Sequence, residues 1–156
     1  MLVYTPYVWP VLVTTAITAS LALYGLRRRS VPGAIPFSVA LLLCLPWELG
    51  AVMELLCAEP EARIVWCKFQ GLWAIPSISG GLWFVLSYAD LRRWLVWPTA
   101  AVMAIVPGLH LLFAFAAPEW VWIGFRLGPT VESIRGLFGT FCVAYGFALS
   151  VVSLVV

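Results

Sequence analysis

Residues 46–70 read PWELGAVMELLCAEPEARIVWCKFQ, two apolar segments joined by a short acidic turn. This turn, residues 57–62, predicts a helical hairpin with its midpoint at residue 61. Glu54 and Lys68 each lie seven residues from that midpoint, so two antiparallel helices place them level with each other. A charged side chain near the membrane centre costs about 2.5–3.5 kcal/mol on insertion scales, and it usually faces other helices and pairs. The spacing therefore predicts a Glu54–Lys68 ion pair inside a helix bundle.

The composition excludes a soluble globular domain. Of 156 residues, 63% are hydrophobic and only 10% are charged, whereas soluble chains average about 25% charged residues. The net charge of +2 and the lack of a clustered basic patch argue against nucleic-acid binding. The lipid bilayer is the expected partner, and the chain is expected to be a multi-pass protein of the plasma membrane.

Apolar runs predict five spans in one transmembrane domain, residues 1–156, because a span needs roughly 20 residues. The expected fold is an all-α polytopic bundle. Residues 117–132 are expected to be irregular and amphipathic, and their two tryptophans and one arginine are expected to lie at the outer interface. The helices are expected at about residues 8–26, 37–56, 62–88, 95–116 and 133–156.

Basic residues predict the orientation of the bundle. The two short loops on one side hold five arginines, and an excess of basic residues in short loops marks the cytoplasmic side. The N-terminus is therefore predicted outside and the C-terminus in the cytoplasm. The five are Arg27, Arg28, Arg29, Arg92 and Arg93.

Small residues offer two further features. Gly80-Gly81 and the glycines 136, 139 and 146 allow either close helix contacts or loose apolar packing. Cys57 and Cys67 flank the acidic turn, so a disulfide between them is geometrically conceivable, with free packing cysteines as the alternative. No cysteine–histidine cluster or CxxC spacing occurs, so neither a metal nor a cofactor is expected.

Two more ionisable residues lie at membrane depth. Glu48 and His110, the only histidine, have comparable depths below the outer ends of their helices. They are predicted to face each other or share a water, and such a pair would titrate and sense pH. The alternative is a protonated Glu48 and an ordinary hydrogen-bonded core histidine.

These polar residues and nearby aromatics make up the candidate site. For Glu54 and Lys68 the alternatives are a structural pair that fixes helix register and the lining of a ligand cavity facing outside. Nine tryptophans and nine phenylalanines allow a pocket for a small apolar ligand, although aromatics are also ordinary at lipid-facing positions. The candidates are Glu48, Glu54, Lys68, Gln70, His110, Trp66 and Trp73.

Catalytic motifs are missing from the sequence. It contains no GxSxG, GxGxxG, HExxH or Walker loop, and the single histidine has no partner signature. No enzyme activity is expected of this chain.

Several runs resemble the N-terminal seven-helix membrane region of bacterial and archaeal sensor histidine kinases. They are LALYGLRRRSVPGAIPF (21–37), WELGAVMEL (47–55), WCKFQGL (66–72) and LSYADLRRWL (86–95). The first holds the basic cluster and proline-glycine turn of that family's first cytoplasmic loop. Trp66, Lys68, Gln70, Glu54 and Tyr88 match family positions. The resemblance implies signal input in a two-component system.

The chain departs from that family in two ways. An N-x-L-H-H-like stretch usually follows the fourth helix, whereas residues 117–122 read APEWVW. Two further helices and the kinase boxes of that family are not found in these 156 residues, so the chain is expected to be a truncated sensor region of a longer kinase or a stand-alone relative. The alternative functions are an accessory subunit of a membrane complex and a small transporter. A homodimer or a partner membrane subunit remains open.

Overall fold

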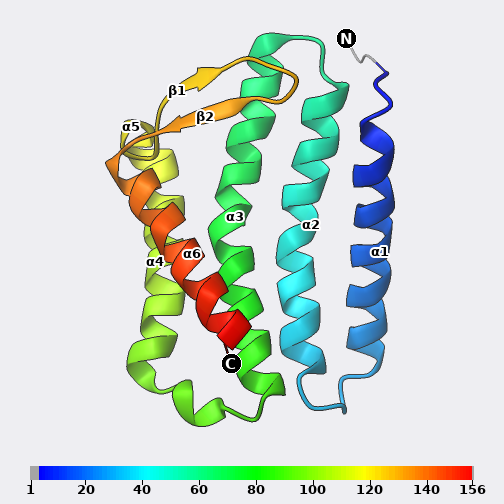
Figure 1. The fold of residues 1–156 in the computed structure, drawn as a ribbon, viewed down its shortest axis with the longest axis vertical. Coiled ribbons are helices and arrows are strands. Elements are labelled where there is room, and N and C mark those ends of the chain that lie inside the picture. Colours follow the sequence, from blue (N-terminus) through cyan, green and yellow to red (C-terminus); the bar gives the residue numbers. More distant parts are fainter. Residues whose placement is uncertain (1–3, 156) are drawn as a thin grey trace.

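The computed structural model describes residues 4–155, which form five long helices and one β-hairpin (Figure 1). The long helices are α1 (Val8–Arg27), α2 (Ala34–Leu56), α3 (Pro60–Tyr88), α4 (Trp97–Ala116) and α6 (Leu137–Val155). The short elements are the 3-10 turn η1 (Arg92–Trp94), α5 (Pro118–Val121), β1 (Trp122–Arg126) and β2 (Glu132–Arg135).

The five long helices are each long and apolar enough to cross a membrane. Their outward faces carry large apolar side chains, as the exposed fractions of Phe115 (76%) and Leu154 (87%) show. Such exposure suits contact with lipid rather than water. The prediction of a multi-pass helical membrane protein is confirmed.

Helix α3 occupies the centre of the bundle. It packs against α2 on one side and against α4 and α6 on the other, while α1 contacts α2 (Figure 1). The hairpin lies at the same end of the bundle as the α2–α3 turn and the N-terminus. The connections that hold the arginine clusters, α1–α2 and α3–α4, lie at the opposite end.

Small residues allow the helices to approach closely, as expected where lipid removes the hydrophobic drive for helix association. A Cβ atom at Gly80 would lie 3.2 Å from the Cα of Ala40 on α2. One at Gly146 would lie 3.0 Å from Ile78 on α3. Gly81 is different, because nothing lies within 4 Å of a Cβ built there. Close contact is therefore made by Gly80 and not by its neighbour.

The prediction of a helix from residue 133 is wrong at its start. Ser133 lies in β2, which pairs antiparallel with β1, and α6 begins at Leu137. Gly136 explains the boundary, since its N–H donates to the carbonyl of Val121 at 2.9 Å. That bond anchors the end of β2 to α5, and the helix starts only after it. The bundle is thus mainly helical with a two-stranded sheet at one end.

The disulfide that was considered between Cys57 and Cys67 is not formed, because all four cysteines are free thiols. Cys67 instead donates its thiol hydrogen to the carbonyl of Val131, with a sulfur–oxygen distance of 3.6 Å.

The contrast between Gly80 and Gly81 generates a prediction. Gly80→Val should destabilise the chain by about 1–3 kcal/mol, because overpacking forces neighbouring backbone apart. Gly81→Val is the matched control and should stay within about 0.5 kcal/mol, since its side chain enters open space. Unfolding in mixed micelles with increasing dodecyl sulfate measures both. Equal losses from the two variants would contradict the packing described for α2 and α3.

Candidate functional site

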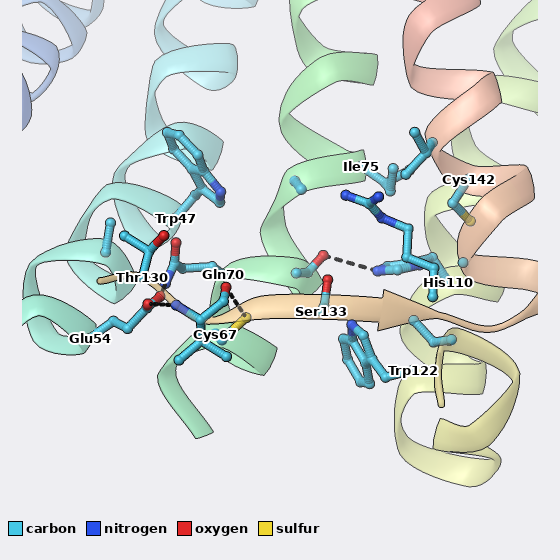
Figure 2. Close-up of a pocket in the computed structure, with 18 of the residues that line it drawn as sticks. Trp47, Glu54, Cys67, Gln70, Ile75, His110, Trp122, Thr130, Ser133 and Cys142 are labelled. Carbon is cyan, nitrogen blue, oxygen red and sulfur yellow. Dashed lines mark hydrogen bonds between the residues drawn. The ribbon is translucent and has the colours of Figure 1, made fainter. Parts of the chain in front are cut away.

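A cavity of about 460 Å³ lies between the hairpin and the helices beneath it. The walls come mainly from α2, α3, α4 and α6, and β1, β2 and the loop joining them supply the roof. We call it the hairpin cavity. Figure 2 shows polar side chains at two places in it. Glu54, Gln70, Cys67 and Thr130 lie on one side, His110 and Trp122 lie on the other, and Ser133 lies between.

Glu54 anchors the first side of the cavity. Its residue is 4% exposed, and both carboxylate oxygens accept hydrogen bonds. The backbone N–H of Val131 donates to Oε1 at 2.6 Å, and Gln70 Nε2 donates to Oε2 at 2.6 Å. Gly50 makes this possible, because a Cβ there would lie 2.6 Å from Cγ of Gln70. One buried carboxylate therefore joins α2, α3 and the hairpin loop.

A second contact fastens the same loop. Arg63, in the first turns of α3, donates from one guanidinium nitrogen to the carbonyls of Gly128 and Pro129, each at 2.8 Å. The thiol of Cys67 reaches the carbonyl of Val131 from below. The loop of the roof is thus held by polar contacts from α2 and α3 together with the buried side chain of Val131.

His110 defines the second side. It is 4% exposed, and its Nε2 donates to the carbonyl of Gly71 at 2.9 Å. Its Nδ1 is buried and has no hydrogen-bond partner among the described residues. Because Nε2 carries the donated hydrogen, Nδ1 of the neutral ring is an acceptor. The indole of Trp122 meets the imidazole edge to face, with ring centroids 6.4 Å apart.

Arg135 adds a cation to this second side. It pairs with Trp122 across the hairpin and lines the cavity, its side chain is exposed, and its guanidinium makes no hydrogen bond or ion pair within residues 4–155. Glu54 is bound at Val131, four residues earlier on the same segment. At a strand rise of about 3.3 Å per residue, the backbone positions of residues 131 and 135 are about 13 Å apart.

The predicted Glu54–Lys68 ion pair is wrong. The ammonium of Lys68 lies 5.4 Å from the centre of the Phe125 ring, in a cation–π contact with the hairpin. Equal distance from the turn places two residues level but leaves their faces undetermined. Gln70 faces Glu54 instead, and the Val131 N–H takes the other oxygen.

The predicted Glu48–His110 pair is also wrong, for the same reason. Glu48 turns toward α1, where Thr18 donates its hydroxyl hydrogen to Oε1 at 2.8 Å. His110, on α4, faces α3. The other oxygen of Glu48 is buried and has no partner among the described residues.

The two candidate tryptophans pack along α3. Phe69 lies between them, with ring centroids 5.6 Å from Trp66 and 6.4 Å from Trp73. Of the seven candidates, Glu54, Gln70 and His110 line the hairpin cavity, and Glu48, Lys68, Trp66 and Trp73 do not. The aromatics at the cavity are Trp47 and Trp122.

Sequence reasoning missed Trp122, Ser133 and Arg135 as cavity residues. All three belong to the segment assigned to an irregular stretch and the start of a helix. The aromatic and β-branched residues Trp122, Ile123 and Phe125 were the available signal, because such residues are enriched in strands. No group of three or more metal-ligating side chains occurs in the part of the chain that the structure describes.

Comparison with known families explains this architecture. Residues 10–156 match a family model described as the N-terminal 7TM region of histidine kinase. The chain belongs to this family. Only the membrane region of the histidine kinase is found, and no kinase domain occurs in the chain. Neither the curated proteins nor the solved structures gave a match.

The contacts of Glu54 predict how this histidine-kinase membrane region holds its roof. Glu54→Ala should raise the hydrogen-exchange rate of the Val131 amide and the hairpin by about tenfold or more, since a charge-assisted bond is lost. Hydrogen–deuterium exchange with mass spectrometry measures this in micelles. Glu61→Ala is the control, because Glu61 is an exposed carboxylate in the same turn region. Unchanged exchange in Glu54→Ala would mean that other contacts hold the loop.

Proposed function

We propose that this chain is a signal-input region in which a small ligand with an apolar body enters the hairpin cavity and alters the bundle. The observation that carries the proposal is the cavity itself, roofed by a segment held mainly through polar side-chain contacts. Its volume of about 460 Å³ falls within the range of roughly 300–1,000 Å³ for small-molecule sites. Membership of a sensor-kinase family favours input over the accessory-subunit and transporter alternatives.

Helix α3 is the best-placed relay. It runs from Pro60, beside the roof, to Tyr88, at the basic end. It contacts α2, α4 and α6, so a shift of its upper half bears on most of the bundle. Pro76 lies within it and removes one backbone hydrogen bond, which lets the two halves bend relative to each other.

We place the hairpin outside and the arginine-rich end in the cytoplasm. Support comes from the clusters at Arg27–Arg29 and at Arg92 and Arg93, which share one end of the bundle. In intact cells a membrane-impermeant maleimide should label Gly128→Cys, in the hairpin loop, and spare Ser30→Cys in the α1–α2 connection. Labelling of Ser30→Cys but not of Gly128→Cys would show that the hairpin lies in the cytoplasm and would contradict this orientation.

If α3 transmits the signal, loosening the hairpin loop should change the autophosphorylation rate of an attached kinase. In vesicles that carry this chain joined in frame to the catalytic domains of a histidine kinase, Glu54→Ala should change the autophosphorylation rate severalfold. Radiolabelled phosphate incorporation measures it. The reason is that loosening the loop alters the upper ends of α2 and α3, which Glu54 joins.

Glu61→Ala again serves as the matched control and should leave the rate unchanged, because this carboxylate is exposed and does not line the cavity. If hydrogen exchange shows the hairpin released in Glu54→Ala while phosphorylation stays at the parent rate, the roof does not carry the signal.

A further inference from the structure

The hairpin cavity contains two polar groups that the fold itself does not use. The guanidinium of Arg135 makes no hydrogen bond or ion pair with any described residue. The Nδ1 of His110 is buried and unpartnered, although unpaired buried polar atoms are costly. Both lie at the Trp122 side of the cavity, since Trp122 pairs with Arg135 and contacts His110.

The hydrogen-bond pattern fixes what each group requires. Arg135 offers planar donors that match a carboxylate. His110 donates through Nε2 to Gly71, so its free Nδ1 accepts from a ligand hydroxyl. A ligand that uses both groups needs an anionic head and a nearby hydroxyl.

The remaining cavity residues indicate that the ligand has an apolar portion and determine which way its anionic head points. Ile75, Val143, Val121 and Cys142 line it with apolar surface. The Glu54 carboxylate is bound at Val131, on the side of the cavity away from His110, and it repels an anion from that side. An acid therefore orients with its head toward Arg135.

We propose that the hairpin cavity binds a small amphipathic hydroxycarboxylic acid, with its carboxylate on Arg135, its hydroxyl on His110 Nδ1 and its apolar chain along α3 and α6. This inference rests on the proposed input role of the cavity and adds the chemical class of its ligand.

Three probes with one chain length and different polar groups test the proposal: 3-hydroxyoctanoate, octanoate and octylamine. Each is titrated calorimetrically into the full chain in nanodiscs, and the heat from empty nanodiscs is subtracted to remove membrane partitioning. Saturable binding should be tightest for 3-hydroxyoctanoate. Octanoate should bind about threefold to tenfold more weakly because one neutral hydrogen bond is lost. Octylamine should bind weakest.

Variants assign the two contacts. Arg135→Met should weaken both acids by about tenfold or more and abolish the preference over octylamine. His110→Phe should abolish the preference for the hydroxyl while octanoate binding persists. Arg126→Met is the matched control, because Arg126 is a hairpin arginine that pairs with Glu132 and does not line the cavity. It should bind as the parent does.

Tighter binding of octylamine, equal binding of the two acids or an equal loss in Arg126→Met would overturn the proposal, as would the absence of saturable binding. The kinase output of Glu54→Ala separates the two levels. If that output changes but no acid binds, the ligand class fails and the input role stands. If 3-hydroxyoctanoate binds in the cavity but the autophosphorylation rate responds neither to it nor to Glu54→Ala, the proposed input role is wrong. The binding site itself would then stand.

Discussion

The buried carboxylate of Glu54 is the constraint on which the site depends. A carboxylate has only acceptors, and in an apolar interior it persists only when donors surround it. Gln70 supplies one donor from α3, and the backbone of Val131 supplies the other from the hairpin loop. The position of the roof is therefore tied to the pairing of α2 with α3. Apolar packing alone would leave a loop of this kind without a defined place.

The rest of the bundle is held by a different kind of interaction. Helices in lipid gain little from burying apolar surface, so association relies on close backbone approach at small residues. Gly80 against Ala40, and Gly146 against Ile78, supply such contacts around α3. One end of the molecule is thus ordered by directional hydrogen bonds, and the membrane-embedded part by shape. A change that breaks these hydrogen bonds therefore loosens the first without opposing the second.

The sequence was sufficient for the five membrane helices and the kinase-sensor family, because apolar run length and short motifs carry both. The pairing of polar residues was not predictable in the same way. Counting from a turn gives the level of Glu54, Lys68, Glu48 and His110 in the membrane, but the side of the helix depends on twist and crossing angle. The hairpin was missed because its strands are four and five residues long and are framed by helices. Its cavity residues, Trp122 and Arg135 among them, were missed with it.

Gly71 is a position where the packing around the site leaves no room for a side chain. Its carbonyl accepts the hydrogen bond of His110, and a Cβ there would lie 2.9 Å from the indole of Trp122. Because Gly71 has no side chain, α3 can contact both His110 of α4 and Trp122 of the hairpin at this position. A homologue with alanine or a larger residue here must move its aromatic roof residue, and with it the shape of the chamber. The side-chain size at position 71 therefore sets where the Trp122 indole lies over the cavity.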